Sequence, residues 1–149
     1  MVSIMKQKEE TCVILDPIRF SSYHRKLRTM MVILHFATRR MFTLQHHKMR
    51  AKKFIYRTAQ LMNPPSGDCI ATLQLKKDQD GLWIYNGRVE EKPLIYLPHG
   101  RIANLIITDI HEKHMHSRAT YTLSRLRETF WISKGRSYFN KVIRLCHKC

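Results

Sequence analysis

The chain has 149 residues and carries 27 lysine and arginine residues against 11 aspartate and glutamate residues, which gives a formal net charge of +16. Its 44% of hydrophobic residues excludes a disordered basic tail, and its length suits one domain or two small modules rather than a two-domain enzyme with its own cofactor fold. A charge excess of this size predicts partners that carry phosphate, either nucleic acid or an anionic membrane surface.

The hydrophobic residues form no segment long enough to cross a membrane. A membrane-spanning helix needs about 18 to 20 apolar residues, and the best candidate, residues 30–36, contains His35. Charged residues at positions 6–10 precede any apolar run, so the start does not resemble a secretory signal. We therefore expect no transmembrane segment and an intracellular location, in the nucleus or the cytoplasm, where thiols stay reduced.

The first 62 residues are the most basic part of the chain. Residues 1–60 hold 13 lysine and arginine residues against three acidic ones. Ser21-Ser22 can cap a helix whose apolar residues recur every three to four positions, so we predict a basic amphipathic helix that runs to about Phe42. A second helix is expected from about Gln45 to Leu61, and residues 1–62 are interpreted as a basic helical connector.

Residues 63–98 are predicted to form a linker and a small β element. The proline-rich residues 63–67 are typical of a linker. Apolar and polar side chains then alternate over residues 70–75, which favours a strand, and Asp80-Gly81 and Asn86-Gly87 predict tight turns. Residues 94–97 are expected to form a further short strand.

Residues 99–149 return to helical periodicity. One helix is expected from Arg101 through His111, with Ile102, Leu105 and Ile106 on its apolar side. Thr122 is predicted to cap a second helix that carries Leu123, Leu126 and Phe130, and Gly135 to precede a third that carries Tyr138, Phe139 and Val142. The expected fold class is α+β and mainly helical: basic N-terminal helices, a small β-hairpin element, then a zinc-stabilised three-helix module.

Four residues in this last segment predict a metal site. His111 and His116 are separated by four residues, and Cys146 and Cys149 by two. Two imidazoles and two thiolates are the four donors of a closed, tetrahedral, structural zinc site. His111 is expected within the first helix and His116 in the turn after it, so one Zn²⁺ would tie that turn to the end of the chain.

Other uses of these residue types are weaker. A redox Cys-x2-Cys pair opens a helix after a strand, whereas this pair follows a helix. Cys12 and Cys69 are taken as ordinary small apolar residues. His114 and His147 are alternative ligands, and the remaining histidines are expected at the surface or in helices: His24, His35, His46, His47 and His99.

The segment from Leu97 to Cys149 resembles the His-His-Cys-Cys zinc-binding domain of retroelement integrases, most closely that of BEL/Pao-type LTR retrotransposons. The matching motifs are His111-x4-His116, Thr122-Leu123, Leu126-Arg127, Phe130-Trp131-Ile132, Gly135-Arg136 and Ile143-Arg144 before Cys146-x2-Cys149. The upstream residues look like the connector that precedes the integrase in such polyproteins. One departure is Arg118, which stands where the family usually has glycine, and a turn that is strained or differently shaped is expected there.

The resemblance implies a zinc-binding module of a protein that takes part in DNA integration. In the family, a catalytic core with three carboxylates that bind divalent metal follows this module. The chain ends at Cys149 and its upstream acids do not form such a pattern, so we expect no integrase catalysis by this chain alone. The implied partners are DNA, another copy of the chain or an integrase core supplied in trans, and no small-molecule substrate.

A set of basic residues in the predicted second and third helices would form the DNA-binding face. They are Arg125, Arg127, Lys134, Arg136, Lys141 and Arg144. Phe130 and Trp131 are expected in the core rather than as stacking platforms. The alternative function is a basic helix protein that binds RNA or an anionic membrane surface through residues 19–57.

Overall fold

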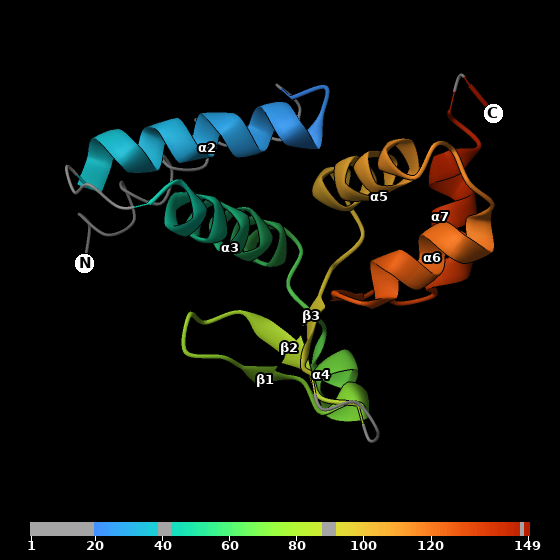
Figure 1. Cartoon of the computed structure of the whole chain (residues 1–149). Helices are drawn as coiled ribbons and strands as arrows, with labels where there is room; N and C mark the ends of the chain where they lie inside the picture. The colour runs from blue at the N-terminus through green and yellow to red at the C-terminus, as the bar shows by residue number, and fades with distance from the viewer. Residues whose placement is uncertain (1–19, 39–42, 88–91, 147) are drawn as a thin grey trace.

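The computed structural model describes residues 20–38, 43–87, 92–146 and 148–149. Helices make up 60% of these residues, and a small four-stranded sheet accompanies them. The expected class, α+β and mainly helical, is confirmed. In Figure 1 the N-terminal helices lie on one side of the molecule and the C-terminal helices on the other, with the sheet and a short helix below them.

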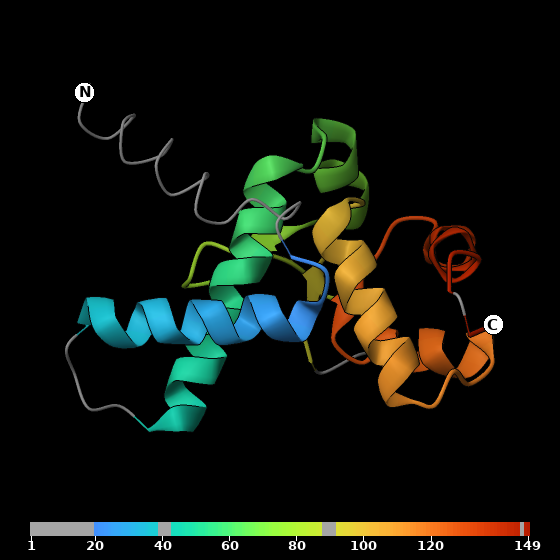
Figure 2. The same cartoon turned by 90° about the horizontal axis from the view of Figure 1, so that it is seen from above.

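The two basic helices predicted near the N-terminus are present. Helix α2 spans Tyr23–Thr38, and its first turn is capped by Ser22, whose Oγ accepts a hydrogen bond from the backbone N–H of Arg25 at 3.4 Å. Helix α3 spans Leu44–Met62 and is capped by Thr43. Helix α2 crosses over α3 (Figure 2). The predicted end of the first helix at Phe42 lies outside the described residues.

The strand predicted over residues 70–75 is wrong, because residues 70–73 belong to helix α4, Gly67–Leu73, and Gln74 caps that helix. Ser66 caps it by accepting a hydrogen bond from the N–H of Cys69 at 3.2 Å, and Gln74 ends it in the left-handed conformation. Six residues make only about 1.7 helical turns, too few for the alternating pattern to exclude a helix. Ser66 supplies the N-cap of the helix that forms.

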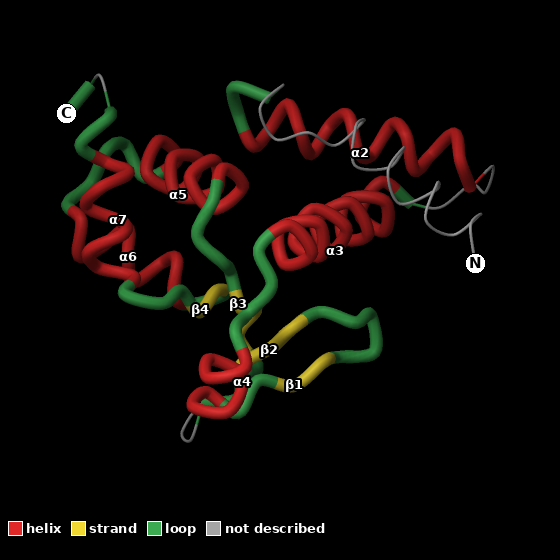
Figure 3. Tube along the Cα trace, turned by 180° about the vertical axis from the view of Figure 1, so that it is seen from behind, coloured by secondary structure: helices red, strands yellow, loops and turns green. Residues whose placement is uncertain are grey.

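The sheet combines four short strands in the order β1-β2-β3-β4. Strands β1 (Lys76–Lys77), β2 (Trp83–Tyr85) and β3 (Leu94–Tyr96) pair antiparallel, and β4 (Phe130–Trp131) adds in parallel to β3 (Figure 3). The turn at Asp80-Gly81 is confirmed: Asp78 Oδ1 accepts from the N–H groups of Asp80 and Leu82, and Gly81 has a φ of +74°. The turn predicted at Asn86-Gly87 leads into residues outside the described ones.

Three helices follow strand β3 in the chain, and β4 lies between the second and the third. They are α5 (Arg101–Lys113), α6 (Ala119–Arg127) and α7 (Gly135–Ile143). Two details of the prediction for the second of these were wrong. Helix α6 begins three residues before Thr122, which is buried inside it, and Phe130 lies in β4, where the parallel pairing with β3 takes it out of the helix. The strain expected at Arg118 is absent, since its φ is −52°.

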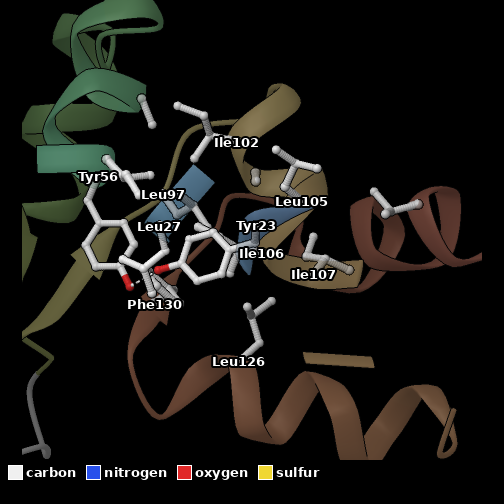
Figure 4. Packing of buried hydrophobic residues seen from close by; sticks show 14 of the residues in the cluster. Tyr23, Leu27, Tyr56, Leu97, Ile102, Leu105, Ile106, Ile107, Leu126 and Phe130 are labelled. Atoms are coloured by element: carbon white, nitrogen blue, oxygen red, sulfur yellow. Dashed lines mark hydrogen bonds between the residues drawn. The ribbon is translucent and has the colours of Figure 1, made fainter. Parts of the chain in front are cut away.

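Helix α5 is the element around which the others pack. It contacts α2, α3, α6 and α7. Figure 4 shows Ile102, Ile106 and Leu105 of α5 beside Tyr23 of α2, with the hydroxyl of Tyr23 hydrogen-bonded to that of Tyr56 at 3.1 Å. The buried cluster continues through Phe130 and Leu126 into the C-terminal helices. The core therefore runs across the predicted boundaries at 62/63 and 98/99, and those domain boundaries remain predictions.

Within the part of the chain that the structure describes, no helix combines the length and the apolar character that crossing a bilayer requires.

Candidate metal centre

His111 lies in the last turn of α5 and is almost completely buried. Its side chain is 2% exposed, and its ring packs edge-on against the ring of Phe139 from α7, with 6.5 Å between the ring centroids. Its Nε2 lies 3.2 Å from Sγ of Cys149. Burial in the helix packing therefore directs Nε2 toward the last residue of the chain.

His116 reaches the same point from the turn after α5, as the spacing predicted. Met115 and His116 both adopt the left-handed conformation, with φ values of +54° and +56°, and the N–H of His116 donates to the carbonyl of His111 at 3.0 Å. Two successive left-handed residues reverse the chain. This reversal brings Nδ1 of His116 to 3.4 Å from Sγ of Cys146 and 3.8 Å from Sγ of Cys149.

The two cysteines lie in the turn that follows α7. The N–H of Cys146 donates to the carbonyl of Ile143 at 2.9 Å, and the N–H of Cys149 donates to the carbonyl of Cys146 at 3.2 Å. These bonds curl the Cys-x2-Cys segment so that both thiols face the histidines. The four side chains that form the cluster come from the C-terminal end of α5 with its following turn and from the turn after α7, so α6 and α7 lie between the two pairs of ligands.

The donor atoms fit a zinc ion. A tetrahedral Zn²⁺ with Zn–N of about 2.0–2.1 Å and Zn–S of about 2.3 Å requires its ligand atoms to lie about 3.3–3.8 Å apart. The three nitrogen–sulfur separations given above are 3.2, 3.4 and 3.8 Å, and all four ligand atoms lie within 4.8 Å of one another. Four nitrogen and sulfur donors leave no open position for a reacting water, so the site is structural.

The alternative ligands are also decided where the structure describes them. His114 ends α5 and its ring packs edge-on against Tyr121 at 5.3 Å, and it is not a member of the cluster. His147 lies outside the described residues. Among the other histidines, which were expected at the surface or in helices, His47 lies in helix α3 and is buried there.

Local electrostatics suit the ligand roles. Burial, followed by the neighbouring His116, lowers the pKa of His111 and keeps its imidazole neutral, the form that binds metal. The backbone N–H of Lys148 is the main cause of a lowered pKa of Cys146, whereas burial raises the pKa of Cys149. Cys146 is therefore the thiol that deprotonates more readily before a metal binds.

Residues 98–149 match the family model described as the integrase zinc binding domain. This segment is similar to integrase zinc-binding domains of the His-His-Cys-Cys type, with His111, His116, Cys146 and Cys149 placed as one zinc site, and is called the zinc-binding domain below. No curated protein and no solved structure gave a significant match.

The six basic residues predicted at the DNA-binding face are all exposed in this zinc-binding domain. Arg125 and Arg127 end α6, Arg136 and Lys141 lie in α7, and Lys134 and Arg144 flank α7. Arg127 and Arg136 both line a groove of about 370 Å³ between α6 and α7, whereas Arg125 is paired with Glu128 at 2.8 Å.

Two contributors to the metal centre were not predicted from the sequence. Phe139 was recognised only as an apolar helix position, and the backbone N–H of Lys148 carried no signal at all. The spacing of residues in the sequence does not encode contacts between helices. It therefore gives neither the packing of Phe139 against His111 nor the direction of the Lys148 N–H group.

Proposed function

We propose that the zinc-binding domain is a DNA-binding and assembly module of a BEL/Pao-type retrotransposon integrase. The observation that carries the proposal is the arrangement of the six exposed cations on α6 and α7, with Arg127 and Arg136 on a shared groove. The zinc ligands precede α6 and follow α7, so a bound ion would hold these two helices in a fixed arrangement.

The chemistry of the face favours phosphate. Arginine guanidinium groups bind phosphate oxygens in a bidentate manner, and basic side chains along a duplex release counterions. Thr120, Ser124 and Asn140 also line the groove and supply uncharged hydrogen-bonding groups beside Arg127 and Arg136. We infer contacts mainly with the backbone of double-stranded DNA rather than with its bases.

The test is the affinity for a duplex of about 20 base pairs, measured by fluorescence anisotropy over a series of salt concentrations. Arg127→Ala and Arg136→Ala should each weaken binding and lower the slope of log affinity against log salt by about 1. Arg125→Ala should have a smaller effect, because Glu128 already neutralises that charge. Lys76→Ala, on the sheet, is the matched control. An affinity that does not depend on salt would contradict DNA binding.

The remaining parts of the proposal follow from the same family. The domain would act without catalysis of its own, by self-association or with an integrase core in trans, in the nucleus or the cytoplasm. The chemistry of the cysteines supports this location. They bind zinc only as thiolates, and thiols stay reduced in the nucleus and the cytoplasm. Binding of RNA or an anionic membrane by the basic helices remains the alternative, and vesicle binding by the full chain tests its membrane form.

A further inference from the structure

A second surface, separate from the zinc-binding domain, lies between the two basic helices. A groove of about 560 Å³ runs along one face of α2, from His24 to Phe36, and over the first turns of α3. Its apolar lining consists of Leu27, Met31, Val32, Phe36 and Leu44. Phe36 and Leu44 are each 74% exposed, so large apolar side chains face solvent on both of its walls.

The groove meets the core at Leu27 and is exposed to solvent beyond it. Tyr23 and Met30 of α2 and Ile55 of α3 are buried in the central cluster, whereas Val32, Phe36 and Leu44 lie toward the other ends of these helices. In Figure 1 the C-terminal end of α2 and the start of α3 are on the side of the molecule away from α5–α7. The groove therefore remains open when the core is fully packed.

Within α2 and α3, the formal charges have one sign. Helices α2 and α3 contain no aspartate or glutamate and carry three and five lysine or arginine residues, respectively. Arg28 and Lys48 line the groove itself, together with the imidazoles of His24, His35 and His47. An occupant must therefore combine an apolar surface with negative charge at its edges.

We propose that this groove binds an amphipathic helix of a partner protein. The bound helix presents apolar side chains at positions i, i+3, i+4 and i+7, and acidic side chains on both flanks. A helix about 10 Å wide inserts one apolar stripe into a groove of this kind. Its stripe would cover Val32, Phe36 and Leu44, and its carboxylates would face Arg28 and Lys48.

Two other occupants fit the same surface less well. A second copy of the chain would bring α2 and α3 against themselves, which places like charges together with no acidic residue in either helix to balance them. An anionic membrane is flat on this scale and would contact the rim of a concave groove while leaving its floor uncovered. The concave shape together with the basic rim favours an acidic helix.

The test uses the zinc-loaded full chain and a fluorescent 18-residue peptide with leucine at the four stripe positions and glutamate on both flanks. Binding is measured by anisotropy, beside a peptide in which lysine replaces every glutamate. The acidic peptide should bind, and the lysine peptide should bind at least about tenfold more weakly. Equal binding of the two peptides, or no binding of either, overturns the proposal.

Paired variants locate the binding surface. Val32→Ser with Phe36→Ser should weaken binding of the acidic peptide by at least about tenfold. Leu61→Ser and Leu145→Ser remove apolar side chains that are similarly exposed but lie outside the groove. Each should change the affinity for the acidic peptide by less than about twofold. Arg28→Glu should weaken binding, and Lys76→Glu on the sheet should not. Equal effects in groove and control variants overturn the proposal.

Two further measurements exclude the other occupants. Sedimentation of the free chain should show the same mass for the wild type and the Val32→Ser, Phe36→Ser variant; dissociation of a dimer by these changes would assign the groove to a second copy. Binding to phosphatidylserine vesicles that disappears in the same variant, without binding of the acidic peptide, would assign it to a membrane surface. Either result overturns the proposal.

Discussion

The two ends of the molecule achieve order by different means. At the end formed by α2 and α3, large side chains such as Tyr23, Ile55 and Tyr56 are buried against α5. At the zinc end, Met115 is 88% exposed and Leu145 is 77% exposed, although each lies next to a metal ligand. Apolar burial stabilises the first end. At the second end, Leu126 and Phe139 are also buried, and a ligand cluster additionally closes the two exposed turns that hold the zinc ligands.

Helix α5 belongs to both ends. Its buried residues include Ile102, Leu105 and Ile106 in the shared core, and His111 at its C-terminal end is a zinc ligand. Loss of the metal should therefore release α7 and the final turn first, while α5 remains packed on α2. The comparison can be tested by disrupting one end and measuring order at the other.

The largest effect is expected from removal of a ligand. Cys146→Ser should reduce bound zinc from about one ion per chain to near zero and abolish hydrogen-exchange protection in α6 and α7, because a zinc site of this class contributes about 10–16 kcal/mol of apparent binding free energy. The amides of α2 and α3 should stay protected. Zinc content by mass spectrometry and amide exchange measure these results. Cys69→Ser is the control, and a Cys146→Ser chain that keeps both its zinc and its protection would contradict the metal assignment.

The converse experiment removes apolar contact at the other end. Ile55 is fully buried in α3, and Ile55→Ala should lower the free energy of unfolding by about 2–5 kcal/mol, through lost burial and the cavity that remains. The folded variant should still bind one zinc ion. Urea unfolding followed by circular dichroism gives the first quantity and metal analysis the second. Met49→Ala, at an exposed position of the same helix, should cost less than about 0.5 kcal/mol. Loss of zinc from folded Ile55→Ala would show that the two ends are not separately stabilised.

A smaller effect is expected at the junction between the two ends. Gly100 has a φ of +152°, and a Cβ placed there would lie 3.0 Å from Nδ2 of Asn63, the residue that ends α3. Its N–H donates to the hydroxyl of Tyr138 in α7 at 2.9 Å. Gly100→Ala should therefore cost about 1–3 kcal/mol in thermal unfolding.

Gly67→Ala is the matched control for this change. Gly67 is the first residue of α4 and has open space around its Cα, so the alanine should be neutral or stabilise the fold by up to about 1 kcal/mol. Equal stability of the two alanine variants would contradict the strain assigned to the junction.

The smallest effect depends on pH. Burial, followed by the positive charge of His35, lowers the pKa of His47 in α3 below its usual value of about 6.5, so the folded chain favours its neutral form. This contribution to stability is present above about pH 6.5 and is lost as the pH falls through that value toward the lower folded pKa. The melting temperature of the wild type should drop more between pH 7.5 and 5.5 than that of His47→Gln.

The zinc ligands also take up protons at low pH, and this affects both proteins in the same way. The difference between the two pH profiles therefore reports His47 alone. His24→Gln, at an exposed position of α2, should follow the wild type. Identical profiles for the wild type and His47→Gln would show that burial of this imidazole has no energetic consequence.

The helices and the metal centre were largely predictable because both depend on short-range spacing. Three- to four-residue periodicity identified α2, α3, α5 and α7, and the spacing of His111, His116, Cys146 and Cys149 identified the zinc ligands. The error over residues 70–75 arose because six alternating residues fit a strand and a short helix equally well. Phe130 was misplaced because its parallel partner, Ile95, is distant in the chain.

From the amino-acid sequence alone follow the basic character of the chain, its mainly helical class and the four zinc ligands, since each of these is set by composition or by residues a few positions apart. Tertiary structure alone decided that Nε2 of His111 and Nδ1 of His116 face the thiols, that His47 is buried, and that α2 and α3 leave an apolar groove open. These features depend on which helix faces meet across long stretches of chain, and packing of whole elements determines that choice.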